Sequence, residues 1–570
     1  MAEENFFADE QDNYDVEVKD VGNLALIAGA FDHFGLEELI DLHIGKIGSH
    51  VKANCGAIVK AMVCQLLNVP YQSLNGTSEY FQNKPADVLL GNKGITHEVL
   101  NRATIARTLD TIYDYGCERL FLQCSAMVAA KMKLKVTSAH IDSTSFHYDG
   151  QTHEEDKSIV RLLLGYSRDH RPDLNQVITV MLCDELTKIP LIQKTVSGNV
   201  NDNKSFYDVV RDNLPLVREQ FKDLRYLTGD SALCTGKILS DAGMQKIYIV
   251  TRVPDKVAFV KELYKNTPLS EMERIDPNDP ECRTLGKWCG TQQIDGNTVK
   301  LLLINNQALR SQKLQTIEKQ AEKELATTET TLKKLSTKPS KCEPDARKAI
   351  SELEKKLKYC DLSNIVYTPV EKAPHRGRLK EGESKILVGV KATADVSINH
   401  ERIEQELEKS LMFVIATTDL ERDWTMAELL RIYRKQAVIE GGWKILKSKK
   451  ILVDALYLQL PSRISALMWL VTLALLIFAA TEYEVRQVME RKQLSIPTVD
   501  QRHREGRPTL MRLFQYIANS GVHLTIIRKI GTITISGLTQ DLKQILNALG
   551  KDWATYFLSS TYSCMLEEVF

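Results

Sequence analysis

The sequence predicts an α/β protein in which helices flank a mixed β-sheet, with a helical domain before the sheet and an insertion within it. Three observations support this fold class. Apolar residues recur at helical spacing over residues 21–135, and strand-like runs begin near residue 136. A charged stretch over residues 254–410 then separates two apolar parts of the chain. At roughly 100–200 residues per domain, a chain of 570 residues has room for all of these parts.

The start of the chain is acidic and lacks the basic and apolar stretches of a secretory signal, so residues 1–20 are interpreted as a disordered leader. Residues 21–135 are assigned to DNA binding or dimerisation. Thr104 is expected to cap the third helix of this domain. A short helix and a turn before it, with Arg102 and Arg107 alongside, would suit a helix-turn-helix. An ordinary helical packing domain explains the same pattern equally well.

Residues 136–253 are predicted to form the first part of the sheet. Three strand-like runs are followed by a helix, a strand that ends at Asp230, a helix near 236–244 and a last strand. This β-β-β-α-β-α-β order is that of an RNase H-like sheet, which is the predicted fold of the core. The predicted strands are VTSAHIDSTSF, QVITVMLCD, PLIQKTVSG, LRYLTGDSAL and KIYIVTRV, and the first helix is NKSFYDVVRDNLPLVREQF.

The insertion, residues 254–410, contains short strands such as NTVKLLLIN and KILVGVKAT. Two highly charged helical runs, roughly 306–336 and 344–359, are separated by STKPSK. The proline between them predicts an antiparallel helical hairpin at about 306–359. A solvated strut is the default interpretation of such a hairpin, and contact with DNA or a second subunit is the alternative.

The second part of the core, residues 411–484, begins with the strand LMFVIATT and a long helix that Asp423 is expected to cap. The apolar run 464–481 is long enough to span a bilayer. Its charged flanks, the lack of a second span and the lack of an aromatic belt favour a buried core helix. The C-terminal region, residues 485–570, opens with a basic stretch and receives no assignment.

Charge and cysteine content set limits on function. The chain has 74 basic and 74 acidic residues, so any contact with nucleic acid must come from local basic patches. The 11 cysteines form no CxxC pair, and Cys282 and Cys289 lack the spacing of a zinc site. Without a signal peptide, this pattern predicts reduced thiols and a cytoplasmic location.

Two aspartates lie at the ends of predicted strands. Asp142 lies late in AHIDSTSF, where His140 points to the same face of the strand. Asp230 ends the apolar strand YLTGD. An acid at the C-terminal end of a buried strand lies at the edge of the sheet where ligands usually bind. For each aspartate the alternative is that it caps the turn that follows.

A third acid, Glu440, lies in the predicted helix after Asp423. Tyr433, Glu440 and Lys447 are spaced by seven residues, and each such step returns to within roughly 20° of the previous direction, so all three lie on one helix face. Four lysines and no acid follow in residues 441–450. Phosphoryl transfer on DNA needs carboxylates that hold two divalent cations roughly 3.5–4 Å apart, which these three acids would provide. An amphipathic helix with a chance heptad of polar residues is the alternative.

The segment IYRKQAVIEGGWKILK resembles the Tyr-x2-Arg-x3-Glu-x6-Lys signature of bacterial insertion-sequence DDE transposases, in the group with a long insertion between the second Asp and the Glu. Gln436 stands where that signature has Arg, so the role of this position is open, and Arg434 or Lys435 could reach the same phosphate. The resemblance covers roughly residues 20–520. Further segments that resemble the group's motifs, in the same order, are HIDSTSF, GYSRDHRPDLNQ, SGNVNDNKSF, DSALCT and YIVTRVP.

The resemblance implies a Mg²⁺-dependent DNA transposase, with Mn²⁺ able to substitute, that cleaves and strand-transfers the ends of an insertion sequence. It implies that the partners are double-stranded DNA, as terminal inverted repeats and target, and a second copy of the chain in the DNA complex. A nucleoid-associated location would follow, with no membrane. By position, Asp142, Asp230 and Glu440 would be the catalytic metal ligands, and Tyr433, Arg434, Gln436, Lys444 and Lys447 would contact DNA.

Two other functions fit the same residues. An RNase H-like nuclease without strand transfer would use the same three carboxylates. A non-catalytic DNA-binding protein derived from a transposase would fit the departure at Gln436, although three intact acids argue against it. The charged loop SRDHRPD could bring Arg168, His170 or Arg171 to DNA or form a salt-bridged turn, and it receives no catalytic role.

Overall fold

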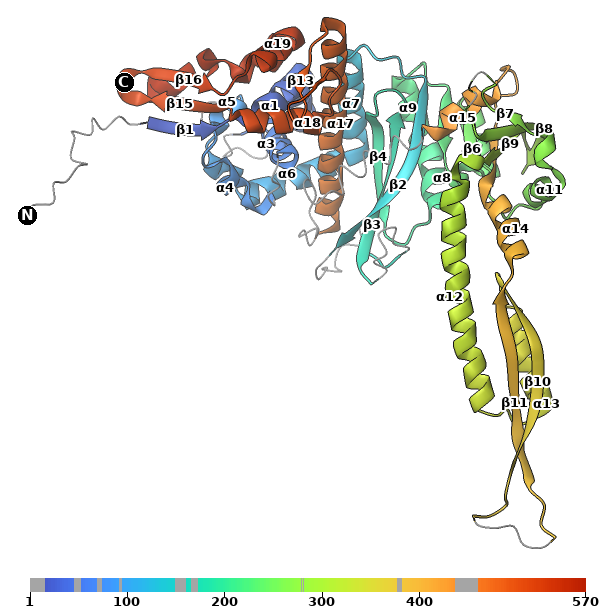
Figure 1. Cartoon of the computed structure of the whole chain (residues 1–570). Coiled ribbons are helices and arrows are strands. Elements are labelled where there is room, and N and C mark those ends of the chain that lie inside the picture. Colours follow the sequence, from blue (N-terminus) through green and yellow to red (C-terminus); the bar gives the residue numbers. More distant parts are fainter. Residues whose placement is uncertain are drawn as a thin grey trace, which may run out of the picture. The chain divides into compact units, whose positions relative to one another are not determined.

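A computed structural model describes residues 16–45, 53–68, 74–91, 95–148, 160–165, 173–277, 279, 281–376, 382–435 and 460–569. The chain forms two compact units (Figure 1). The first contains residues 1–251, 294–297 and 431–570, and the second contains residues 252–293 and 298–430. Several residues singled out in the sequence lie outside the described part of the chain: Arg168, His170, Arg171, Gln436, Glu440, Lys444 and Lys447.

The first unit begins with a helical region, as the sequence predicts, but two local predictions are wrong. Residues 16–20 of the expected leader form strand β1 (Val16–Asp20). The third predicted helix is capped by Asn101, whose side chain accepts the backbone N–H of Thr104 at 3.1 Å, so Thr104 lies inside the helix. The helices are α1 (Gly22–His33), α2 (Leu36–Ile44), α3 (Cys55–Leu67), α4 (Thr77–Phe81), α5 (Ala86–Leu89), α6 (Arg102–Tyr115) and α7 (Cys117–Lys131).

The sheet of the first unit has the strand order β4-β3-β2-β5-β6. The first three strands along the chain pair antiparallel, whereas β5 lies parallel to both β2 and β6. This mixed sheet with flanking helices confirms the predicted fold class. The predicted helix over 203–221 is two helices that meet at Asn213. The elements are β2 (Ser138–Tyr148), β3 (Asn175–Asp184), β4 (Pro190–Ser197), α8 (Asp202–Asp212), α9 (Leu214–Gln220), β5 (Tyr226–Gly229), α10 (Gly236–Met244) and β6 (Tyr248–Arg252).

The apolar run 464–481 lies within one long helix, α17 (Pro461–Lys492), which packs against α3, α6, α7 and β4. Its most apolar stretch of 18 residues is 94% buried inside the protein. This burial favours the core helix over the membrane span, because a helix enclosed by protein offers lipid no apolar surface.

The C-terminal region, which the sequence left unassigned, packs onto the N-terminal helices. Strand β1 pairs with β15 and β15 pairs with β16, both antiparallel. Trp553 is buried against α1, where its backbone carbonyl would lie 3.0 Å from a Cβ placed on Gly29. The region contains β13 (Ile496–Pro497), β14 (Arg504–Glu505), α18 (Leu510–Ser520), β15 (His523–Ile527), β16 (Thr532–Ser536), α19 (Gln540–Leu549) and α20 (Lys551–Ala554).

The second unit contains a sheet of order β12-β9-β8-β7 and the predicted helical hairpin. The two hairpin helices, α12 and α13, are not a free strut. Both pack onto the antiparallel ribbon of β10 and β11, where Leu332, Ile350 and Val390 share one buried cluster. The elements are α11 (Ala258–Asn266), β7 (Glu273–Arg274), β8 (Thr284–Ile294), β9 (Asn297–Asn306), α12 (Arg310–Thr337), α13 (Glu343–Glu354), β10 (Cys360–Lys372), β11 (Ile386–Ile398), α14 (His400–Leu411) and β12 (Met412–Thr417).

The helix that follows β12, α15 (Met426–Arg434), begins with a capping box. The Thr425 hydroxyl accepts the N–H of Glu428, and the Glu428 carboxylate accepts the N–H of Thr425, both at 3.2 Å. The cap is therefore Thr425, and the prediction of Asp423 is wrong by two residues.

Candidate active site

The parallel pairing of β2 and β5 brings the two predicted aspartates together. The register pairs His140 with Thr228. Asp142 lies two residues after His140, and Asp230 lies two residues after Thr228. The two aspartates therefore occupy the same level on neighbouring strands. Paired strands lie about 4.8 Å apart, and residues two apart share a face. The two carboxylates are therefore neighbours on one face, at the C-terminal end of the parallel pair.

A glycine makes this close pairing possible. A Cβ on Gly229 would lie 2.8 Å from Cγ2 of Ile141 and 2.7 Å from Cδ1 of Leu233. Any larger residue there would push β5 away from β2, or Leu233 out of the core. Gly229 thus fixes the backbone directly before Asp230.

The carboxylate of each aspartate accepts a hydrogen bond from a backbone N–H one or two residues later in the chain. Asp142 is only 8% exposed, and its Oδ1 accepts the N–H of Ser143 at 2.8 Å. Oδ1 of Asp230 accepts the N–H of Ala232 at 2.9 Å, so Asp230 does cap the turn that follows it. A carboxylate has about four lone-pair positions. A backbone hydrogen bond of this kind orients the carboxylate and is compatible with metal binding.

His140 lies on the same face of β2, one position behind Asp142. It is completely buried, and neither ring nitrogen has a hydrogen-bond partner among the described residues. Burial lowers the pKa of His140 to about 4, against the opposing effect of Glu185, while the nearby cation of Lys435 lowers it further. The imidazole is therefore neutral near pH 7, and it adds no charge beside the two carboxylates.

The ion pair between Lys435 and Glu185 ties the chain after α15 to this region of the sheet. Burial alone would raise the pKa of Glu185, but the hydrogen bond from Lys435 and its charge outweigh this effect, so the pKa lies below its ordinary value. Glu185 directly follows β3, so the rule that selected Asp142 and Asp230 could also have found it. Glu440 lies five residues after Lys435 in the sequence.

The structure thus brings together two of the predicted metal ligands and leaves the third outside the described residues. Within the described part of the chain, no cluster of three or more His, Cys, Asp or Glu side chains could hold a metal ion. Of the predicted DNA-binding residues, Tyr433 is half-buried and Arg434 is exposed at the end of α15. Asp142 and Asp230 fit a divalent cation because they offer adjacent carboxylate oxygens, the ligands that Mg²⁺ prefers.

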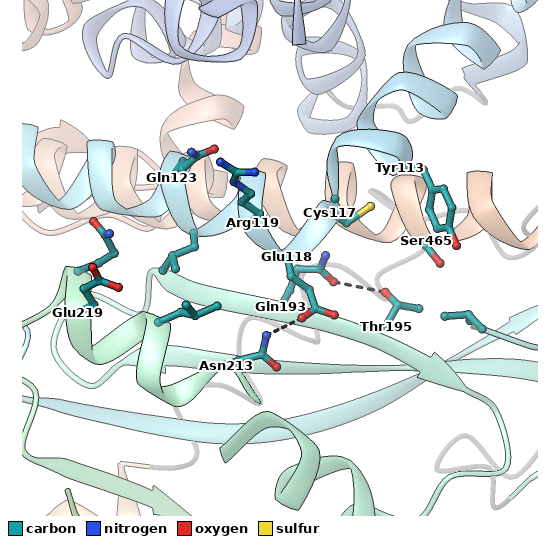
Figure 2. A pocket seen from close by; sticks show the side chains of 15 residues that line it. Tyr113, Cys117, Glu118, Arg119, Gln123, Gln193, Thr195, Asn213, Glu219 and Ser465 are labelled. Atoms are coloured by element: carbon teal, nitrogen blue, oxygen red, sulfur yellow. Dashed lines mark hydrogen bonds between the residues drawn. The ribbon is translucent and has the colours of Figure 1, made fainter. Parts of the chain in front are cut away.

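A cavity of about 680 Å³ opens on the same face of the sheet (Figure 2). Gln193 and Thr195 of β4 form its floor, and the Thr195 hydroxyl donates to Oε1 of Gln193 at 3.3 Å. The register pairs Gln193 with Met181 and Met181 with Asp142. The cavity therefore lies two strands, or about 10 Å, from Asp142. Most of the remaining lining residues come from α7, α9 and the start of α17, with Tyr113 of α6 and Val160 beside them.

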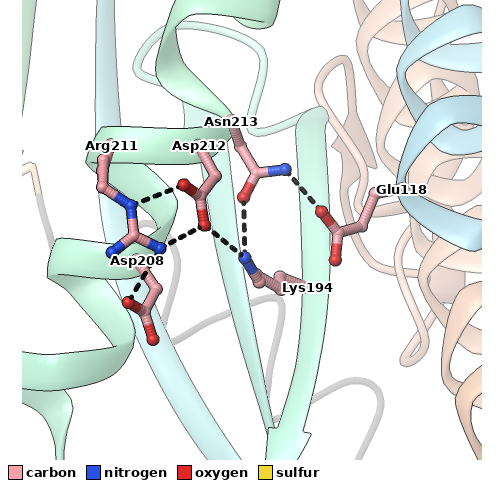
Figure 3. Close-up of polar contacts among 6 residues, drawn as sticks. All are labelled: Glu118, Lys194, Asp208, Arg211, Asp212 and Asn213. Atoms are coloured by element: carbon pink, nitrogen blue, oxygen red, sulfur yellow. Dashed lines mark hydrogen bonds and ion pairs between the residues drawn. The ribbon is translucent and has the colours of Figure 1, made fainter. Parts of the chain in front are cut away.

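Beside the cavity, a polar network links α7, β4 and the junction of α8 and α9 (Figure 3). Lys194 donates to Asp212 and to Asn213, each at 3.4 Å, and the Asn213 amide donates to Glu118. The hydrogen bond from Arg211 to Asp212 lowers the pKa of that carboxyl. The network satisfies the buried Asn213 at the helix break and holds α7 against the edge of the sheet.

Comparison with known proteins gives two family matches. The model described as "Transposase DDE domain" matches residues 139–477, more than half of the chain. The model described as "Domain of unknown function (DUF4277)" matches residues 16–126. Among solved structures, the chain is similar to the piggyBac transposase in a synaptic complex with hairpin DNA, with 11% identity and a TM-score of 0.35 over 94% of this chain and 88% of that chain. No curated protein matches.

Proposed function

Because this chain belongs to the transposases that carry a DDE domain, we propose that it cleaves and strand-transfers the ends of an insertion sequence by two-metal-ion phosphoryl transfer. Membership of this family implies nuclease or transferase activity and the use of divalent metal ions. The matched segment includes Asp142, Asp230 and Glu440. The observation that carries the proposal is the β2–β5 register, which supports a shared role for the two aspartates.

In the proposed mechanism, Asp142, Asp230 and Glu440 hold Mg²⁺, for which Mn²⁺ can substitute. Bound metal ions would polarise the scissile phosphate and stabilise the attacking and leaving oxygens. The protein's own contribution is position and charge. Backbone hydrogen bonds orient Asp142 and Asp230, and the neutral His140 behind them keeps the local charge negative.

The proposed substrate is double-stranded DNA, as the terminal inverted repeats of a bacterial insertion sequence and as target. Tyr433, Arg434, Gln436, Lys444 and Lys447 are the proposed contacts with its backbone. Gln436 stands where the family signature has an arginine, and Arg434 or Lys435 could contact the same phosphate in its place. We also propose a homodimer in the DNA complex and a cytoplasmic, nucleoid-associated location.

The test is cleavage and joining of a labelled DNA duplex that ends in the element's own terminal repeat, with Mg²⁺ and a target plasmid. Asp142→Ala, Asp230→Ala and Glu440→Ala should each reduce cleavage by at least about a thousand-fold, since each would remove a metal ligand. DNA binding and the thermal midpoint should stay close to those of the unchanged protein. Asp223→Ala, which removes a half-exposed carboxylate elsewhere, is the matched control.

Undiminished cleavage by any one of the three variants would remove that residue from the metal site. Cleavage without joined product would favour the nuclease without strand transfer. Binding without cleavage by the unchanged protein, with either Mg²⁺ or Mn²⁺, would favour the non-catalytic DNA-binding protein.

A further inference from the structure

The second unit has an arm, residues 310–411, built from α12, α13, the ribbon β10–β11 and α14. The helices of the hairpin cover only part of the ribbon. A backbone bridge between Ser340 and Val390 marks where the chain between α12 and α13 last contacts it. Figure 1 shows both strands continuing past the ends of these helices. We call residues 333–348, 366–376 and 382–391 the distal end of the arm.

The distal end is strongly basic in a chain whose total charge is zero. Residues 333–348 contain six basic and two acidic residues, and the other two segments contain four basic and two acidic residues. Most of these cations are exposed and have no ion-pair partner among the described residues. Those exposed cations are Lys333, Lys334, Lys338, Lys341, Lys348, Lys372, Arg376 and Lys385.

Nearer the base of the same arm the charges balance, since residues 310–332 contain four basic and four acidic residues, and some of the cations there form ion pairs. Arg310 pairs with both Glu404 and Glu408 of α14. Lys358 pairs with Glu406 at 2.6 Å. The uncompensated charge of the distal end is therefore a local property of that end.

The ribbon also exposes apolar side chains there. Ile386, Leu387 and Val388 are 55%, 57% and 47% exposed, and Val366 is 54% exposed. Three consecutive exposed residues of a strand point to both of its faces, so neither face is covered at this level. A two-stranded ribbon is only marginally stable alone in water, so a surface that covers it would also stabilise it.

We propose that the distal end binds double-stranded DNA, with the β10–β11 ribbon in the major groove and the lysines between α12 and α13 on flanking phosphates. A major groove about 12 Å wide admits a two-stranded ribbon. Apolar side chains suit the thymine methyl groups on the floor of that groove. A second copy of the chain is the poorer partner, because a symmetric contact would set these cations against one another. The inference adds a DNA contact to the proposed function, far along the chain from the metal ligands.

The test compares two variants that each remove four exposed charges from the arm. The distal variant combines Lys333→Gln, Lys334→Gln, Lys338→Gln and Lys341→Gln. The control combines Lys313→Gln, Lys319→Gln, Lys323→Gln and Lys356→Gln near the base. Binding of the full chain to a 60-base-pair duplex is measured from about 50 to 300 mM KCl without divalent metal. Each lost phosphate contact lowers the slope of log K against log salt by about 0.9, so the distal variant should lose a slope of about 3–4.

The control variant should keep the slope within about half a unit, and both variants should keep the thermal midpoint. Leu387→Ser with Val388→Ser should weaken binding several-fold with the slope unchanged, because these residues make no phosphate contact. Equal losses in the distal and control variants would overturn the inference. A changed oligomeric state with an unchanged slope would overturn it in favour of a second copy.

Failure of this inference can be told apart from failure of the proposed function. If the distal variant binds normally while the unchanged protein cleaves DNA, only the arm contact is rejected. If the slope falls as expected but no cleavage occurs with Mg²⁺ or Mn²⁺, the arm contact stands and the catalytic proposal is rejected.

Discussion

Two long helices, α17 with 32 residues and α12 with 28, differ in how much of their surface is buried. The most apolar stretch of α17 is 94% buried, and helices and a strand pack around it. Helix α12 buries only Ile317, Ala321, Thr328 and Leu332, which form one stripe along it. The apolar content of a helix thus reports how many of its sides are packed. It does not by itself report a membrane.

We expect the largest difference in the free energy of unfolding when a leucine is replaced by alanine in each of the two helices. Leu473→Ala in α17 removes a fully buried side chain enclosed on all sides, and we expect a loss of about 3–5 kcal/mol in the free energy of unfolding. Leu332→Ala in α12 removes a side chain from a small cluster that can relax, and we expect about 2 kcal/mol. Urea titration followed by tryptophan fluorescence and circular dichroism measures both. An equal or larger loss for Leu332→Ala would contradict the contrast.

A buried charge next to α17 should have an intermediate effect. Helix α3, which packs on α17, carries the fully buried Lys60, whose Nζ donates to Asp32 at 2.5 Å, to Glu37 at 3.3 Å and to Tyr556 at 3.1 Å. Lys60→Met would leave two partly buried acids without their cation. We expect a loss of about 3 kcal/mol at pH 7. Lys313→Met, which removes an exposed lysine of α12, should change stability by less than about 0.5 kcal/mol.

The pH dependence of Lys60→Met follows from Glu37. Burial raises the pKa of Glu37, and Lys60 partly offsets this rise. Without Lys60 the pKa rises further, so the folded state takes up this proton at a higher pH than the unfolded state. Such a group contributes stability at low pH that is lost as pH rises through the folded pKa. The loss caused by Lys60→Met should therefore be smaller at pH 5 than at pH 7, and a larger loss at pH 5 would count against it.

A smaller loss of stability tests how the exposed arm depends on helix caps. Asn399 caps α14 by accepting the N–H of Arg402 at 3.1 Å, and its amide donates to Asp361 at 2.6 Å. Asn399→Ala should lower the stability of the arm by about 1 kcal/mol. Hydrogen exchange of the α14 amides measures this loss locally. Protection that is lost equally in α17 would show that the two helices unfold together.

Much of the core could be predicted because each element carries its own pattern. Helix α10 begins and ends where the sequence places it, at 236 and 244. Asp230 was found in the same way, since the end of an apolar run marks the end of a strand, and it directly follows β5. Asp142, predicted late in its strand, lies in the middle of β2, which continues to Tyr148. Helix caps were missed by two or three residues because several polar residues compete at each start. Thr104 and Asp423 were chosen where Asn101 and Thr425 make the hydrogen bonds.

Relations between distant segments could not be predicted. Nothing in the short strand β1 indicates that it pairs with β15. The distal end of the arm combines three segments that lie apart in the sequence, and only the fold brings their charges together. The proximity of the two aspartates could not be predicted either. The sequence could only place each at a strand end, whereas the register of β2 and β5 places Asp142 beside Asp230. The assignment of Glu440 still depends on the family pattern.

The pairing of β1 with β15 has a consequence for how the chain is made. Glu17 and Arg528 form an ion pair across 511 residues of sequence. A ribosome adds about 5–20 residues per second, so Glu17 waits roughly 25–100 seconds for its partner. During that time the N-terminal helices lack the surface that covers them in the finished protein. Vectorial synthesis thus leaves the first domain open to chaperones or other proteins until the last part of the chain emerges.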